Sequence, residues 1–423
     1  MSDRVVVVGA GIVGVSVARE LARRGVKVSV IERERGVGLG STARTSSVVR
    51  CHYTRPEAIA LANEGAAVWS EWADHVGLEN PRARYVKSGV LFLLRQGEGE
   101  SNSGALGVKA EMDKRNLDRR LDMMQRAGVR CELLDQREME SRFRFFSFPD
   151  RDVVGIWEPN GGFVFPPVGA VEDLEEAALR AGADFHFNTE LRVGNTIWEG
   201  GRRRVRGVVA AGPEGDFEIE ASAVINCAGP KSHALNVAFN CPLPLTTLPQ
   251  RQFIVEGTWS NPQEGVPAMA DLEEGFYIRP HREVFKVGAT LPVDHVDFSD
   301  DLKSEGAKVA AEEFEGRVLE ALYRRFPKVE LSDVKTHLAF YDWTVVDSYP
   351  ILDETEVAGY YVAIGTSGAW FKSGPVIGEM MAARVAGDLR NRPIEWFECS
   401  RTGQKIPLDA FSAQTGRRPR GGA

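Results

Sequence analysis

The feature that most constrains this chain is the glycine turn GAGIVG at residues 9–14. A β-branched run over 4–8 precedes the turn and predicts a strand, and the amphipathic pattern of 12–24 predicts a helix after it. A second strand is predicted over 27–32 and ends in the acidic residue Glu32. This order of strand, glycine turn, helix, strand and acid is typical of a βαβ unit that binds a dinucleotide.

A physical requirement explains why glycine stands at each of these three positions of the turn. Gly9 permits the tight turn, Gly11 lets the backbone approach a pyrophosphate, and Gly14 lets the helix pack closely on the strand. The free N–H groups and positive dipole end of the helix would face the phosphates. Glu32 can accept hydrogen bonds from ribose hydroxyls, and its charge disfavours the extra phosphate of NADP. A glycine turn without a ligand is the alternative, and the turn does not separate FAD from NAD.

Length and composition limit the remaining possibilities. A chain of 423 residues is too long for one compact core, so we expect two domains. The net charge of −8 argues against a nucleic-acid partner. The five cysteines are odd in number and lack CxxC spacing, which suits reduced thiols in a cytoplasmic protein. No run of 18 apolar residues predicts a membrane span, and the seven histidines lack HxxxH spacing, so no metal site is expected.

Three further stretches carry a resemblance to a known family. They are GSTARTSSVVR over 40–50, AVINCAGP over 223–230 and GTSGAWFK over 365–372. With the glycine turn, they resemble the D-amino-acid oxidase and sarcosine oxidase superfamily of FAD-dependent amine oxidases, most closely the monomeric sarcosine oxidase branch. The resemblance implies FAD as the cofactor. The first stretch would wrap the FAD, the second would pass beside its adenine half, and the third would face the N1/O2 edge of the flavin.

The resemblance also implies an architecture of the α/β class, with a Rossmann-type FAD-binding domain and a second, mixed-sheet α+β substrate domain. The FAD-binding domain would be discontinuous, over residues 1–80, 157–240 and 342–400. The substrate domain would take 81–156 and 241–341, and 401–423 would form a polar tail. Residues 96–127 would be a surface excursion of the substrate domain, made of a polar linker and a charged helix over 108–126.

The glycine turn and the resemblance together assign a set of cofactor contacts. These residues lie in the turn, after the second strand, in the Ser/Arg-rich loop, and in the two later stretches. They are Gly9, Gly11, Ile12, Val13, Gly14, Glu32, Arg33, Ser41, Thr42, Ser46, Ser47, Ala228, Gly229, Gly368, Ala369, Trp370, Phe371 and Lys372.

Two basic residues are candidates for binding substrate. Arg50 closes the Ser/Arg-rich loop, and Lys372 follows Phe371 in the C-terminal stretch. In the family a basic pair at these positions binds a substrate carboxylate, and two converging cations would hold it by charge-assisted hydrogen bonds. The alternative is that Arg50 binds an FAD phosphate and Lys372 is a surface lysine.

Three residues are candidates for the reaction centre. Lys286 falls where sarcosine oxidases place a lysine near flavin N5, and a cation there would stabilise superoxide as O2 accepts its first electron. An outward-facing strand lysine is the alternative. Tyr277 and Tyr341 match positions that line the substrate pocket, where each would present a hydroxyl toward the amine. Core tyrosines with satisfied hydroxyls are the alternative.

The chain also departs from the family pattern. Monomeric sarcosine oxidase attaches FAD through a cysteine two residues before the pocket tyrosine, and that position is Ala339 here. We therefore expect noncovalent FAD. The family's active-site histidine is replaced by Thr290, which puts sarcosine itself in doubt and favours a larger secondary amine or amino acid.

The resulting hypothesis is an FAD-dependent oxidase of a C–N bond in an amino acid or N-alkylated amino acid. Hydride would pass to flavin N5, water would hydrolyse the imine, and O2 would reoxidise the flavin to give hydrogen peroxide. One alternative is a dehydrogenase of the same fold that oxidises an amino or 2-hydroxy acid and uses an electron carrier. The other is a non-catalytic FAD-binding subunit.

Overall fold

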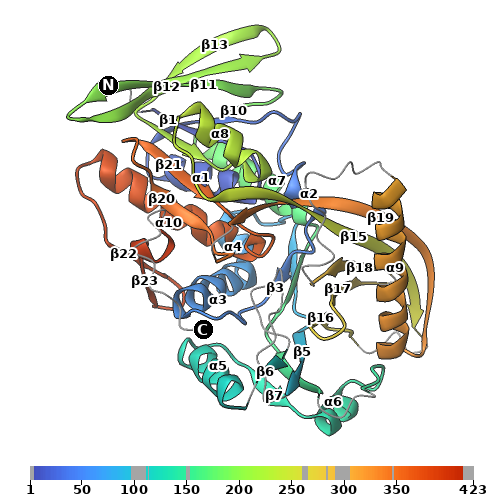
Figure 1. The fold of residues 1–423 in the computed structure, drawn as a ribbon. Helices are drawn as coiled ribbons and strands as arrows, with labels where there is room; N and C mark the ends of the chain where they lie inside the picture. Colours follow the sequence, from blue (N-terminus) through green and yellow to red (C-terminus); the bar gives the residue numbers. More distant parts are fainter. Residues whose placement is uncertain are drawn as a thin grey trace.

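The computed structural model describes residues 4–96, 111–112, 114–148, 153–259, 265–282, 284–290, 305–344 and 347–412. Two large sheets dominate this part of the chain, one toward the upper left of Figure 1 and one toward the lower right. The mixture of sheets and helices confirms the expected α/β class. Among the described residues, no helix combines the length and apolarity needed to cross a membrane.

The first sheet has six strands in the order β10-β2-β1-β14-β21-β20. The first five run parallel, and β20 is antiparallel to β21. The strands come from widely separated parts of the chain, so the sheet forms by long-range pairing. Their bounds are Arg4–Val8 for β1, Lys27–Ile31 for β2, Asp184–His186 for β10, Ala223–Asn226 for β14, Ile351–Glu354 for β20 and Tyr360–Ile364 for β21.

Both faces of this sheet are covered, which explains why β1 is apolar without alternation. Val5 and Val7 belong to a core with the helices of one face, and Val6 and Val8 belong to a core on the other face. The helices that contribute to the first core are α1 (Ile12–Arg23), α3 (Pro56–Ser70), α4 (Trp72–Val76), α7 (Pro167–Arg180) and α10 (Gly374–Leu389).

A three-stranded antiparallel sheet and α8 (Ser232–Ala238) cover the opposite face. Its strands are β11 (Glu190–Glu199), β12 (Arg202–Gly212) and β13 (Gly215–Glu220). Residues 218–226 belong to two different strands. The chain leaves β13 at Glu220 and enters β14 of the parallel sheet at Ala223, because these strands pair with different neighbours.

The second large sheet has nine strands and is mixed, as expected. The helix α9 (Glu305–Arg325) covers one of its faces, beside β15 and β18 in Figure 1. The strands in spatial order are β19 (Val329–Thr344), β15 (Leu245–Trp259), β18 (Val284–Ala289), β17 (Phe276–His281), β16 (Ala268–Asp271), β5 (Val90–Gln96), β8 (Val153–Glu158) and β7 (Glu132–Leu134), with β6 (Glu111–Met112) paired to β5.

The segment expected to be a surface excursion is packed into the molecule where it is described. Helix α5 (Lys114–Arg126) begins later than expected, and its Met124 joins the core of the parallel sheet. Asn63 of α3 donates a hydrogen bond from its side chain to the carbonyl of Ala127, 2.7 Å away. Helix α5 therefore bridges the core of one sheet and the face of the other, where Leu117 is buried. Residues 97–110, which include the predicted linker beyond Gln96 and the start of the predicted helix, lie outside the described residues.

The helical segment over 56–76 is interrupted at Glu71, whose φ of −117° is not helical. Within the polar tail expected over 401–423, β23 (Lys405–Pro407) pairs with β22 (Trp396–Glu398), and the short helix η4 (Leu408–Phe411) buries Phe411 completely. Residues 413–423 lie outside the described part of the chain. The boundaries proposed for the two domains stay a prediction.

Candidate active site

The glycine turn has the geometry that its sequence predicts. Gly9 has a φ of +102°, and a Cβ there would lie 2.5 Å from the carbonyl oxygen of Cys227. A Cβ on Gly14 would lie 1.9 Å from the carbonyl oxygen of Gly9. Both positions therefore require glycine for reasons internal to the fold. Gly11 differs, because a Cβ there would meet Thr42 Oγ1 at 3.4 Å, an ordinary contact. Its glycine is explained by space for a ligand beside the helix.

Helix α1 starts without a side-chain cap at Gly11, as an anion-binding helix end requires. Thr42 approaches from the one-turn helix α2 (Ser41–Arg44), and its Oγ1 accepts a hydrogen bond from the Ile12 N–H at 3.3 Å. Glu32 follows β2 and accepts hydrogen bonds from the backbone N–H groups of Ala10 at 2.6 Å and Glu34 at 2.9 Å. The carboxylate is thus fixed beside the turn. The site suits a dinucleotide, because it combines the glycine turn, the N-terminus of α1 and the fixed carboxylate of Glu32.

The other predicted cofactor contacts occupy loops around this turn. Ser41 donates to the carbonyl of Phe340 at 2.6 Å, and Ser47 donates to the carbonyl of Val164 at 2.6 Å. These bonds fix the Ser/Arg-rich loop between β9 (Gly162–Phe165) and β19. Ala228 and Gly229 follow β14 and lead into a short 3-10 helix. Arg33 is half-exposed and pairs with Glu34 at 3.3 Å.

One cavity joins the Ser/Arg-rich loop, the C-terminal turn and the nine-stranded sheet. It brings together four of the predicted reaction residues, Arg50, Lys372, Tyr277 and Tyr341. Of the predicted cofactor contacts, Ser46, Ser47, Gly368, Ala369 and Phe371 also line it. The remaining walls are mostly apolar, with one amide: Thr45, Val48, Val90, Phe92, Gln250, Met269, Ala270, Ala289 and Ser367.

The two predicted cations are both buried at this cavity, with exposures of 5% for Arg50 and 2% for Lys372. Tyr53, which sequence reasoning missed, lies between them. The guanidinium carbon of Arg50 lies 4.3 Å from the centre of the Tyr53 ring, and Lys372 Nζ donates to the Tyr53 hydroxyl at 2.6 Å. Tyr53 in turn donates to the carbonyl of Ala369 at 2.9 Å. The tyrosine therefore sets the spacing of the pair by a cation–π contact and a hydrogen bond.

A buried carboxylate that the sequence did not signal holds the same segment. Glu158 ends β8, and its two oxygens accept the backbone N–H groups of Cys51 at 2.7 Å and His52 at 2.9 Å. Burial raises the pKa of Glu158, while the Cys51 N–H and the Arg50 charge oppose that rise. Arg50 also donates to the carbonyl of His52, so the chain immediately after the cation is fixed at both N–H and C=O.

The hydroxyls of the two predicted tyrosines are hydrogen-bonded to one shared residue. Gln252 on β15 donates from Nε2 to the hydroxyl of Tyr277 at 2.9 Å and to the hydroxyl of Tyr341 at 3.1 Å. Because the amide nitrogen is the donor, both phenol oxygens act as acceptors toward Gln252. Burial raises the pKa of both tyrosines, so they are protonated at neutral pH. Glutamines stand at positions 250 and 252 of this strand, and nothing in the sequence indicated that Gln252 would hydrogen-bond the two tyrosines.

Lys286 is buried, which excludes the outward-facing alternative, but it is not among the residues that line the cavity. Its Nζ donates to the backbone carbonyls of Arg44 and Thr45, behind the Ser/Arg-rich loop. Across the sheet it pairs in register with Arg279 of β17, a like charge. Burial, then Arg279 and Arg44, lower the pKa of Lys286 to about 7.

Three other residues discussed in the sequence analysis are all buried. The Trp370 ring is buried in the core of the parallel sheet and stacks on Tyr53 at 4.8 Å, so its side chain does not wall the cavity. Ala339 is buried on β19 opposite Gln250 and offers no thiol. Thr290 is buried just after β18.

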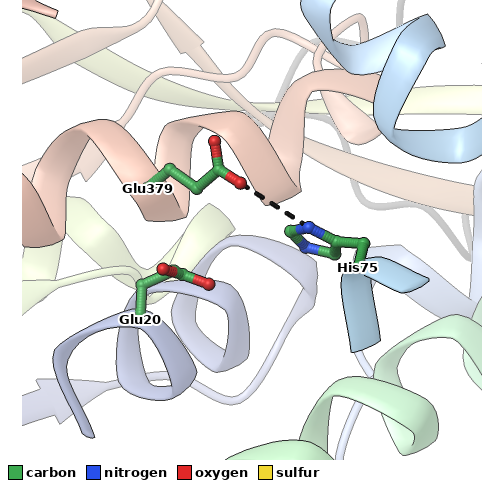
Figure 2. Close-up of side chains that lie close together, drawn as sticks. All are labelled: Glu20, His75 and Glu379. Carbon is green, nitrogen blue, oxygen red and sulfur yellow. Dashed lines mark ion pairs between the residues drawn. The ribbon is translucent and has the colours of Figure 1, made fainter. Parts of the chain in front are cut away.

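A separate polar cluster brings Glu20, His75 and Glu379 within 4.8 Å of one another, a spacing that metal ligands adopt (Figure 2). Arginines already occupy it, however. Glu20 pairs with Arg19 and with Arg24 at 2.7 Å, and Arg401 pairs with Glu379 at 3.4 Å. Burial and the neighbouring arginines lower the pKa of His75 to about 2. The arrangement is an ion-pair network that joins α1, α4 and α10 to the chain near residue 401.

The parallel sheet with its glycine turn, and a cavity lined by residues of the mixed sheet, are the arrangement expected of a flavin-dependent oxidoreductase. A family model described as FAD-dependent oxidoreductase (DAO) matches residues 4–384. The chain therefore belongs to the DAO family of FAD-dependent oxidoreductases, which confirms FAD as its cofactor and the family resemblance seen in the sequence.

Individual relatives are distant. FAD-dependent oxidoreductase domain-containing protein 1 of Xenopus laevis is 22% identical over 438 residues, covering 96% of this chain and 83% of the relative. The crystal structure of L-proline dehydrogenase from P. horikoshii superposes with a TM-score of 0.75 at 20% identity and covers 98% of each chain. Glycine oxidase from Geobacillus kaustophilus gives a TM-score of 0.70 at 19% identity, covering 97% of this chain and 99% of that one. At these identities the structures support the fold.

Proposed function

We propose that this enzyme oxidises a C–N bond in a small amine that bears a carboxylate, an amino acid or N-alkylated amino acid. The observation that carries the proposal is the convergence of Arg50 and Lys372, both buried, on one cavity. Holding two positive charges out of water at these positions has a high cost in solvation, which an anionic ligand between them would offset. A carboxylate matches both by charge-assisted hydrogen bonds.

The rest of the cavity supports an amine as the other end of the substrate. The Tyr277 hydroxyl, held by Gln252, faces the cavity from the sheet side and can hydrogen-bond the amine. Apolar walls from Phe92 and Met269 leave the carbon skeleton in a dry environment. FAD, when bound against the Ser/Arg-rich loop and the C-terminal turn, supplies the acceptor for hydride. The protein groups bind and orient the substrate and exclude water.

The names of similar solved structures also favour a substrate of the amino-acid class. Two of them are described as an L-proline dehydrogenase and a glycine oxidase, both named for amino-acid substrates. These names describe those proteins, and they make an amino or imino acid the first class of compound to test here.

We place an oxidase before a dehydrogenase because Lys286 is a buried cation held next to the Ser/Arg-rich loop. A positive charge there would favour the superoxide that forms when O2 takes its first electron. A dehydrogenase that uses an electron carrier is the second candidate, since Lys286 lies behind the loop backbone and does not line the cavity. Reaction of the reduced protein with O2 or with an artificial dye separates the two.

The proposal is tested by an anaerobic screen of amino acids and N-methyl amino acids for bleaching of the flavin. With the compound found, Arg50→Ala and Lys372→Ala should each raise the dissociation constant by roughly 10- to 100-fold. Their effects should be less than additive if both groups bind one carboxylate. Lys87→Ala, at an exposed lysine, is the control. Bleaching by no amine, or a substrate without a carboxylate, would contradict the proposal, and the first result would favour a non-catalytic FAD-binding subunit.

A further inference from the structure

The side-chain nitrogen of Lys372 has one position left for a ligand. Nζ donates to the hydroxyl of Tyr53 at 2.6 Å and to the backbone carbonyl of Ala369. Tyr53 is not among the residues that line the cavity, whereas Ala369 and Lys372 both line it. A neutral amine has two N–H donors, which these two acceptors satisfy, and it keeps a lone pair at the remaining position. An ammonium would instead present a third N–H with no acceptor until a ligand arrives.

The charges around Lys372 favour the neutral form while the cavity holds no anion. Arg50 is the cation that faces it, and Glu158 is the carboxylate, with the Cys51 thiol beside them. Burial first, and then Arg50, lower the pKa of Lys372 well below its ordinary value, and Glu158 opposes this only in part. Two buried cations would therefore share one buried carboxylate, whose oxygens are already engaged by backbone N–H groups.

The elements packed against Lys372 add no further charge to it. Helix α3 presents Gly65 and Trp69, whose indole N–H donates to the Lys372 carbonyl at 2.7 Å. The nearby Glu64 carboxylate is directed elsewhere, toward the backbone N–H groups of Arg401 at 3.1 Å and Thr402 at 2.9 Å. Helix α10, which follows directly, has no acidic residue in its first turn.

We propose that Lys372 is a neutral amine in the substrate-free site and gains a proton when a carboxylate binds between it and Arg50, and that an amino-acid substrate supplies this proton from its own ammonium group. The inference rests on the proposed function. One N–H bond of the substrate ammonium breaks and its electron pair stays on the substrate nitrogen as a lone pair. The lone pair of Nζ forms the new N–H bond, and a zwitterionic substrate brings no net charge into the site.

Two requirements of the reaction are met by this one transfer. A C–H bond next to nitrogen yields hydride readily when the nitrogen has a free electron pair, which an ammonium lacks. The carboxylate, in turn, is bound most strongly when both of its partners are charged. Lys372 is thus proposed as a catalytic residue, because it removes the substrate's proton, as well as a carboxylate ligand.

The test uses acetate, the smallest carboxylate and one without an amine, titrated into the FAD-loaded enzyme and followed by the perturbation of flavin absorbance from pH 6 to 9. Acetate stays ionised throughout this range, so binding that requires uptake of one proton should weaken tenfold for each pH unit above the pKa of free Lys372. Lys372→Arg, whose side chain is always charged, should bind acetate with no such slope. Lys372→Gln should bind it more weakly, also without a slope, and Lys87→Arg should behave as wild type.

Each outcome bears on a distinct part of the proposal. A wild-type affinity that does not change with pH, or a slope that persists in Lys372→Arg, overturns the role of Lys372 while leaving the carboxylate site standing. No binding of acetate overturns both this inference and the proposed function. Glycine brings its own proton, so its half-saturating concentration, measured anaerobically by displacement of acetate, should be constant from pH 6 to 8.5. A slope equal to that of acetate, or no competition, would show that the substrate is not the proton source.

Discussion

Replacing Lys286 with methionine should stabilise the protein at neutral pH, against the usual effect of a core substitution. Lys286 is 5% exposed and is hydrogen-bonded to backbone carbonyls. The two charges that act on it, those of Arg279 and Arg44, are both positive. Methionine fills a similar volume with no charge, so it removes an unfavourable ammonium without opening a cavity.

The size of the effect follows from the pKa of Lys286. Burial and the two arginines lower it from 10.5 to about 7, which corresponds to about 5 kcal/mol of lost stability when the lysine is charged. Between pH 7 and 10.5 the unfolded chain binds this proton and the folded chain does not, so wild-type stability should rise with pH by up to about 1.4 kcal/mol per pH unit. Below pH 7 the full cost remains.

The measurement is the difference in unfolding free energy between Lys286→Met and wild type, from denaturant titrations of the apoprotein at several pH values between 7 and 9.5. The advantage of the variant should be largest at pH 7 and shrink steadily as pH rises. Lys335→Met is the matched control, because Lys335 is exposed and lies on β19, across β15 from Lys286. Both lysines pair in register with Ile254 of β15. A difference that does not depend on pH would refute the assignment of an uncompensated buried lysine.

Three further predictions concern the cofactor. The purified protein should be yellow and should release its flavin on acid precipitation, because Ala339 offers no thiol; colour that stays with the precipitate would contradict this. Glu32→Ala should weaken FAD binding through lost hydrogen bonds to a charged acceptor, each worth about 1.5–3 kcal/mol, whereas Glu34→Ala should not; equal FAD retention on dilution in both would exclude Glu32 as the ribose ligand. In stopped flow, Lys286→Met should reoxidise with O2 roughly 100- to 1000-fold more slowly while anaerobic bleaching stays within about tenfold of wild type. If its reoxidation matches wild type, Lys286 is structural.

Local sequence patterns were enough to predict the strand, glycine turn and helix that open the dinucleotide fold. The strand, turn and helix from Arg4 to Arg23 are set by neighbours along the chain, and the requirement for glycine at positions 9 and 14 follows from contacts that any such turn makes. Arg50 and Lys372 could be placed because they stand at fixed offsets from recognisable loops. The structure brings them to one cavity, although their roles stay a proposal.

The supporting residues could not be predicted in this way. Glu158 contacts Cys51 and His52 across more than a hundred residues of sequence, and a glutamate at the end of a strand is ordinarily exposed. Tyr53 gains its position from Arg50 on one side and Lys372 on the other. Such contacts depend on tertiary packing, which overrides local propensity and leaves no periodic signal in the sequence.

The order of strands in the parallel sheet has a consequence for folding during synthesis on the ribosome. The central strand β1 is synthesised some two hundred residues before its neighbour β14, and β21 follows more than a hundred residues after that. One edge of β1 therefore stays unpaired until β14 has also been synthesised. At a synthesis rate of about 5–20 residues per second, that interval lasts many seconds. Nascent chains stopped before residue 360 should be unable to retain FAD, and an exposed β1 edge makes this interval the period when chaperones matter most.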